Sequence, residues 1–203
     1  MRTSGKISFR PGKRLSWLRI CLYLTLLAGA LLGRAAPACV KTEVWQSICG
    51  MVADAFSVQS GYGFRELYGT VLAAYLMVDA ILIFCVFSVF SAPLSFLAVL
   101  VCGVGAGAGL TALMESFGMN GALFLFCAVV PGLTAAFCVY MAQAEAVVVC
   151  SRALFRSFGH SGGPDKSVFG EFGRKTLINI LLLAFCALYY TVMRLYVILP
   201  PAV

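Results

Sequence analysis

Charge is the scarcest property of this chain. Only 11% of its 203 residues are Asp, Glu, Lys or Arg, eight of them are acidic, and there is one histidine. Soluble domains carry roughly 25% charged residues, whereas 62% of this chain is hydrophobic. The composition therefore excludes an ordinary soluble domain and predicts a single membrane domain, with no room for a second globular one.

The chain also lacks the residue patterns of catalysis and metal binding. It contains no H-E-x-x-H, no G-x-S-x-G and no CxxC or Cys/His metal spacing, and His160 lies in a polar stretch. Seven of the nine cysteines lie in or beside apolar runs, where cysteine behaves as a small hydrophobic residue. We therefore expect a protein that is not an enzyme and that has no cofactor or metal.

Long apolar runs are what the chain has instead. The run from Val71 to Phe90 has about the length that a helix needs to cross the ~30 Å hydrocarbon core. Together the runs predict an all-α, polytopic membrane helix bundle with about five transmembrane helices. The expected spans are 17–33, 71–90, 94–113, 122–155 and 176–199.

The fourth span contains Pro131-Gly132, which predicts an interruption of that helix, because proline removes a backbone donor and clashes with the preceding turn. Two interpretations are open. The pair either kinks a continuous helix or marks a re-entrant segment beside a cavity, as the broken helices of transporters do.

The distribution of Lys and Arg predicts the orientation. With the N-terminus inside, eleven of the fifteen Lys and Arg residues lie on the cytoplasmic side and four on the outer side. This assigns residues 1–15 to a cytoplasmic basic tail and 16–203 to the membrane domain, with segment 34–68 and the C-terminus outside. The net charge of +7 then follows from topology and not from binding to nucleic acid.

The first span also has features of a secretory signal. Basic residues precede it, and Ala36-Pro37-Ala38 resembles an A-x-A cleavage site. Its length favours an uncleaved signal-anchor helix, with cleavage or lipidation of Cys39 as the alternatives. Cys39 and Cys49 both fall on the expected oxidising side, so a disulfide between them is open if the geometry allows it.

The outer segment contains an apolar stripe. Val44, Ile48 and Met51 recur at helical spacing, which predicts a short amphipathic helix. Such a helix packs on its own bundle, lies in the membrane surface with Trp45 as its anchor, or presents the stripe to a partner.

Small residues form a second pattern, in the third span. Gly103, Gly105, Gly107 and Gly109 make two overlapping G-x-x-x-G pairs, 103/107 and 105/109. Pairs of this kind strip one face of a helix so that another helix can approach closely. We expect close packing within the bundle, or dimerisation of the chain through the same face.

Ionisable side chains inside apolar spans are candidates for function. Asp79 lies centrally in the second span, and Glu145 lies within the fourth, near the expected cytoplasmic interface. Asp79 either pairs with a basic residue or stays protonated and donates a hydrogen bond to a neighbouring helix.

The order of these features resembles the stage II sporulation protein M family of bacterial membrane proteins. The resemblance covers about residues 10–198. The matching features, in chain order, are a basic tail and first span, FRELYGTVL, a hairpin around Ser91-Ala92-Pro93, a glycine-rich helix at 100–110, VVPGLTAAFCVYMAQAEAVVVCS, a basic inner loop and a last span.

The resemblance implies a non-enzymatic scaffold in the bacterial cell membrane. Its implied partners are the cell-wall hydrolases called stage II sporulation proteins D and P, with which the family acts during engulfment. The alternative function is a transporter or permease subunit, in which Asp79, the glycine-rich helix and the broken fourth span line a path.

Overall fold

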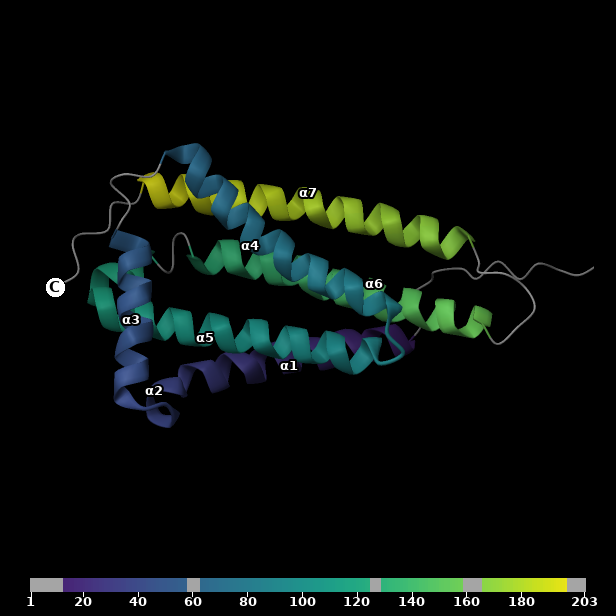
Figure 1. Ribbon diagram of the computed structural model, residues 1–203, viewed down its shortest axis with the longest axis horizontal. Coiled ribbons are helices and arrows are strands. Elements are labelled where there is room, and N and C mark those ends of the chain that lie inside the picture. The colour runs from purple at the N-terminus through teal and green to yellow at the C-terminus, as the bar shows by residue number, and fades with distance from the viewer. Residues whose placement is uncertain (1–12, 58–62, 125–128, 159–165, 197–203) are drawn as a thin grey trace, which may run out of the picture.

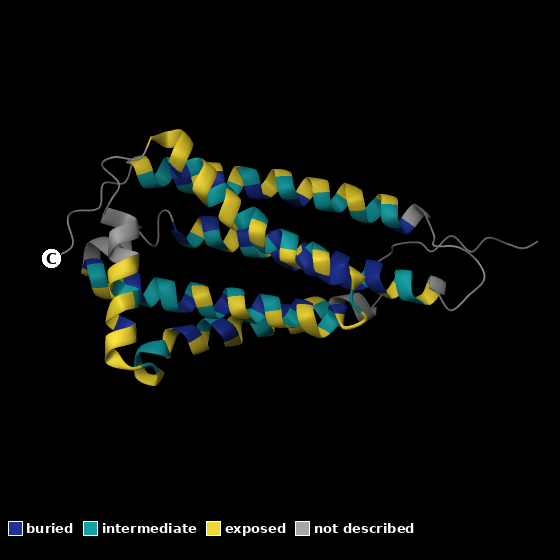
Figure 2. Ribbon diagram, viewed as in Figure 1, coloured by how far each residue is buried: buried dark blue, intermediate teal, exposed yellow. Residues whose placement is uncertain are grey.

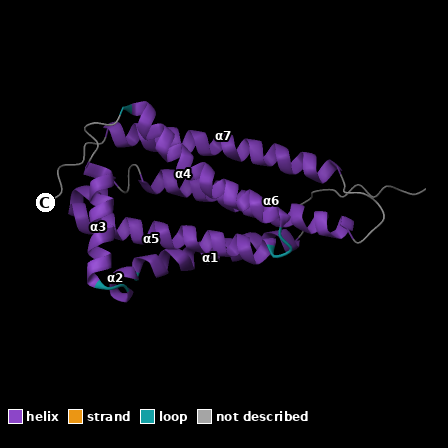
Figure 3. Ribbon diagram, viewed as in Figure 1, coloured by secondary structure: helices purple, strands orange, loops and turns teal. Residues whose placement is uncertain are grey.

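A computed structural model gives the structure of residues 13–57, 63–124, 129–158 and 166–196. These ranges are almost wholly helical and contain no strand (Figure 3). The long helices that run side by side in Figure 1 are α1 (Lys13–Arg34), α4 (Phe64–Phe84), α5 (Ser91–Phe124), α6 (Val130–Phe158) and α7 (Lys166–Tyr196). Each of these helices is long and apolar enough to cross a membrane. The prediction of an all-α, multi-pass membrane bundle is therefore confirmed.

The short elements mark the two ends of the bundle. Helix α2 (Ala36–Cys39) leads into α3 (Thr42–Ser57), which lies across the ends of the long helices in Figure 1. We call this the α3 end. The opposite end, where α1 begins and α6 finishes, is called the basic end. There the 3-10 turn η2 (Cys85–Phe87) follows α4 and precedes α5.

Helix α1 packs most closely against α5, and glycine makes this contact possible. A Cβ atom added to Gly103 or Gly107 of α5 would collide with backbone oxygens of α1, and one added to Gly29 or Gly33 of α1 would collide with backbone oxygens of α5. Each helix thus contributes one G-x-x-x-G pair to the crossing. The pair on α1 was not part of the sequence-based prediction.

The second glycine pair on α5 has different surroundings. A Cβ atom on Gly105 or Gly109 would meet open space within 4 Å. The expectation that both pairs pack against one neighbouring helix therefore differs from the structure. In a helix, residues two apart point about 200° from one another, so the two pairs lie on opposite faces of α5.

Helix α6 is the most buried of the five long helices (Figure 2). Its residues Tyr140 and Ala144 belong to the main core cluster, together with Leu22 of α1, Leu82 of α4 and Leu183 of α7. Helix α6 therefore connects the α1–α5 pair to α4 and α7.

The expected break of the fourth span lies at its beginning. Helix α6 starts at Val130, so Pro131 and Gly132 fall in its first turn, and the helix then continues to Phe158. Proline suits this position, because the first-turn amides have no intrahelical acceptor in any case. The preceding residues 122–124 belong to the end of α5, beyond a kink at Gly118, where φ is 55°, and residues 125–128 lie outside the described ranges.

Other helix boundaries also differ from the prediction: α4 ends at Phe84 and not at 90, and α5 runs from Ser91 to Phe124 and not from 94 to 113. Helix α4 starts at Phe64 and α7 at Lys166, each several residues before the expected apolar spans. The added first turns carry polar residues such as Glu66 and Lys166. A hydropathy pattern finds the part of a helix that is immersed in hydrocarbon, whereas the helix itself extends beyond it.

Candidate functional sites

Helix α3 is fixed to the end of α5 by a small polar cluster. The indole Nε1 of Trp45 donates a hydrogen bond to Oε2 of Glu115 over 2.6 Å, and the Cys49 thiol donates to the same oxygen over 3.6 Å. The Ser116 hydroxyl donates to the Cys49 carbonyl over 3.5 Å. Trp45 is only 7% exposed, so it anchors α3 to the bundle. This placement does not fit an anchor in the membrane surface.

The thiols of this segment are free. Cys39 and Cys49 are not bonded to one another, so the open disulfide is not formed. Burial, with the neighbouring carboxylate of Glu115, raises the pKa of the Cys49 thiol. Both influences disfavour the thiolate, the form that reacts.

The predicted apolar stripe on α3 is only partly covered. Val44 is 50% exposed, Met51 is 62% exposed and Ile48 is half-buried. Because successive helical residues point about 100° apart, Val44 lies about a quarter-turn around α3 from the anchoring Trp45. We call Val44, Ile48 and Met51 the α3 stripe.

Asp79 is buried at the middle of the bundle and is 1% exposed. Neither of its carboxyl oxygens has a hydrogen-bond partner among the described residues. One turn earlier on α4, the carbonyl of Tyr75 accepts a hydrogen bond from the Tyr140 hydroxyl over 3.2 Å. A buried charge without a partner is very costly, so the surroundings of Asp79 suit the protonated, neutral acid.

Glu145 has the opposite surroundings. It forms a two-pronged ion pair with Arg19 of α1, through Nε and, over 2.9 Å, through Nη2. Its carboxylate lies on α6 toward the basic end, and this geometry suits a guanidinium and a carboxylate. The pair joins α1 to α6 and gives Glu145 a structural partner that was not predicted from the sequence.

A buried amide chain continues the polar layer beside this ion pair. Asn179 donates to Gln143 over 2.6 Å, and Gln143 donates to the Thr176 hydroxyl over 3.1 Å. A cavity of about 200 Å³ lies between Glu145 and Asn179. These uncharged residues were not predicted as a site, although their polar side chains inside apolar runs were a usable signal.

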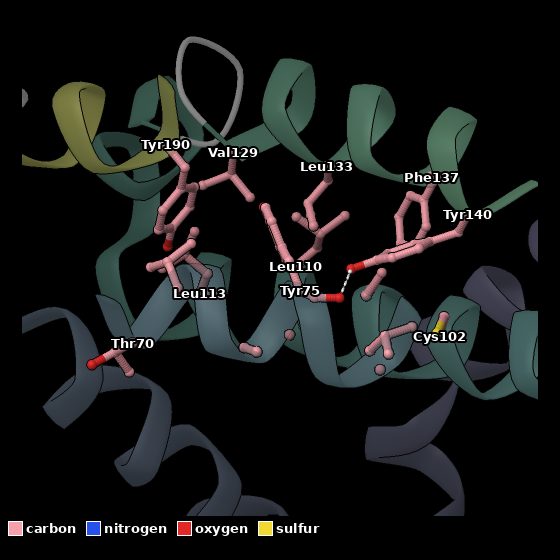
Figure 4. A pocket seen from close by; sticks show the side chains of 16 residues that line it. Thr70, Tyr75, Cys102, Leu110, Leu113, Val129, Leu133, Phe137, Tyr140 and Tyr190 are labelled. Carbon is pink, nitrogen blue, oxygen red and sulfur yellow. Dashed lines mark hydrogen bonds between the residues drawn. The ribbon is translucent and has the colours of Figure 1, made fainter. Parts of the chain in front are cut away.

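A larger, apolar cavity of about 490 Å³ lies between α4 and α5, closed on its far side by α6 and α7 (Figure 4). Gly105 and Gly109, the glycines that do not pack on α1, line one wall, and Ala74 lines the opposite wall. Leu133, Phe137 and other apolar side chains point into it (Figure 4). Asp79 does not line this cavity, although its neighbours Tyr75 and Val78 do.

Within the described ranges, no three His, Cys, Asp or Glu side chains gather closely enough to hold a metal ion. Comparisons with protein-family models, with curated proteins and with solved structures found no match to this chain. The functional proposal therefore starts from the chain's own sequence and from the geometry of its residues.

Proposed function

We propose that this chain is a non-enzymatic membrane scaffold that holds a partner protein at its α3 end. The observation that carries the proposal is the α3 stripe. It is an apolar surface on a helix outside the spans, left half-exposed, while the same helix is fixed to the bundle through Trp45 and Glu115. A rigidly held apolar patch suits recognition of a partner, because little conformational freedom is lost on binding.

The resemblance to the stage II sporulation protein M family supplies the class of partner. The proposal places the chain in a bacterial cell membrane with the α3 end outside, as the excess of Lys and Arg at the basic end and in the tail favours. A surface at the outer face is where cell-wall hydrolases such as stage II sporulation proteins D and P would meet it.

The α3 stripe provides the direct test. Val44→Lys with Met51→Lys places charge on the patch, and Gln46→Lys serves as the matched control, because Gln46 is exposed on another side of α3. In an endospore-forming host, the double variant should reach the membrane at normal levels but recover much less of hydrolases D and P on affinity purification. Gln46→Lys should recover them normally.

Deletion of the gene tests the role in the cell. The scaffold predicts that the septum forms while migration of the membrane around the forespore stalls. Normal recovery of the hydrolases by the double Lys variant would remove the α3 stripe from the interface. Normal engulfment after deletion would remove the sporulation role altogether.

A transport subunit is the second candidate, and Asp79 is the observation that favours it. A buried acid without a partner resembles the proton-carrying groups of transporters. In the described ranges Asp79 lacks nearby acidic or basic groups that would extend a relay. The scaffold is therefore the better-supported function.

A further inference from the structure

The 490 Å³ cavity has the depth of one leaflet. Along α5 its lining runs from Cys102 to Leu113, eleven steps of about 1.5 Å each, or roughly 17 Å. The hydrocarbon core is ~30 Å thick, so the cavity covers about half of it, the half toward the α3 end. Ala74 and Gly105 are exposed, so the cavity is open sideways to the bilayer between α4 and α5.

The volume of the cavity suits a hydrocarbon chain and not a protein helix. A methylene group occupies about the volume of a water molecule, roughly 30 Å³, so 490 Å³ holds about sixteen of them. Three turns of a helix about 10 Å wide would need roughly 1,300 Å³. A transmembrane helix from a second copy therefore does not fit inside, although its side chains could touch the rim.

The lining suits hydrocarbon as well. Two of its few polar groups are already engaged within the protein: Thr70 donates to the Glu66 carbonyl, and Tyr140 donates to the Tyr75 carbonyl. The tyrosine pair Tyr75 and Tyr140, whose rings meet edge to face at 6.5 Å, lies toward the middle of the bundle. The deep part of the cavity thus offers aromatic and aliphatic surface.

A cation lies one helical turn beyond the cavity lining, on α7 toward the α3 end. Tyr190 lines the cavity near the α3 end (Figure 4), and Arg194 follows it by one turn on the same face of α7. Arg194 is half-buried in the last turn of this helix. A guanidinium at this depth is placed for the phosphate of a lipid headgroup.

We propose that this cavity holds one acyl chain of an anionic phospholipid from the leaflet at the α3 end, with the headgroup phosphate at Arg194. The inference does not depend on the scaffold function, on the partner or on the direction of the chain across the membrane. It gives Gly105 and Gly109 a role, which is to leave room for the acyl chain.

Cavity-filling variants test the acyl-chain site. Gly105→Leu with Gly109→Leu adds eight carbons, about half of the available space. The new Cβ atoms meet no neighbour, and leucine is the better helix former, so the double variant should fold. Gly69→Leu is the matched control, because a Cβ at Gly69 also meets open space but Gly69 does not line the cavity.

The measurement is native mass spectrometry of the full chain from vesicles of phosphatidylcholine and palmitoyl-oleoyl phosphatidylglycerol. The natural chain and Gly69→Leu should retain one phosphatidylglycerol after extensive detergent washing, and the double leucine variant should retain none. Arg194→Gln should lose the preference for phosphatidylglycerol over phosphatidylcholine. Arg65→Gln should keep that preference, because Arg65 is exposed at the same end without lining the cavity.

Two results would overturn the site. Equal lipid retention by the natural chain and the double leucine variant would show that the retained lipid binds elsewhere. A dimer without retained lipid, lost in the double leucine variant, would assign the glycine face to a second copy of the chain. An undiminished preference for phosphatidylglycerol over phosphatidylcholine in Arg194→Gln would remove Arg194 from the proposal.

Discussion

At the scale of single residues, Asp79 and Glu145 are two acidic side chains of the same kind with different surroundings. Glu145 is matched by a guanidinium, whereas Asp79 has no partner within the described ranges. We expect Asp79→Asn to change the free energy of unfolding by less than about 1 kcal/mol, because an amide replaces a neutral acid of equal size. Removal of one partner from a buried ion pair costs roughly 3–5 kcal/mol, and Glu145→Gln should lose part of that, since Arg19 is half-exposed.

Unfolding of both variants in mixed detergent micelles would measure the difference. A strong loss of stability in Asp79→Asn would mean that Asp79 is charged and paired. The same Asn variant also distinguishes the two candidate functions: a scaffold keeps its partner, while a proton relay loses solute transport.

The different surroundings of Asp79 and Glu145 were not predictable, because a sequence shows which acids lie at membrane depth but not which basic side chain reaches them.

At the scale of elements, the α1–α5 crossing depends on four glycines. Gly103→Leu or Gly107→Leu would push a side chain into the backbone of α1, so we expect loss of folded protein or a large fall in the melting temperature. Gly105→Leu and Gly109→Leu should have little effect, because the space beside them is open. Thermal unfolding in detergent, followed by size-exclusion chromatography, gives the comparison. Equal losses of stability in the leucine variants of Gly103, Gly105, Gly107 and Gly109 would contradict the crossing.

This crossing also shows how far the sequence predicts an element. The two G-x-x-x-G pairs of α5 have the same spacing and composition, so local pattern predicts two small faces and cannot tell which one meets a helix. The partner pair, Gly29 and Gly33, lies in a span that also resembles a secretory signal. Helix type and the apolar spans were predictable from hydropathy, because lipid forces backbone polar groups into helices. Pro131 was expected to interrupt the fourth span but lies in the first turn of α6, because an apolar run does not show where a helix begins.

At the scale of the whole molecule, the orientation across the membrane remains a prediction. The long helices alternate in direction, which places α3 and the end of α7 at one end of the bundle and the end of α6 at the other (Figure 1). Basic residues are retained on the cytoplasmic side, and the basic tail precedes α1 at the basic end.

We therefore expect alkaline phosphatase to be active when fused after Lys41 or Val203, and a fluorescent protein fused after Arg156 to fluoresce. Fluorescence of a fusion after Val203, with an inactive phosphatase there, would contradict five spans with the N-terminus inside. If the fusions after Lys41 and Arg156 also exchanged their activities, the whole bundle would be inverted, and the α3 stripe would then face cytoplasmic partners instead of the cell wall.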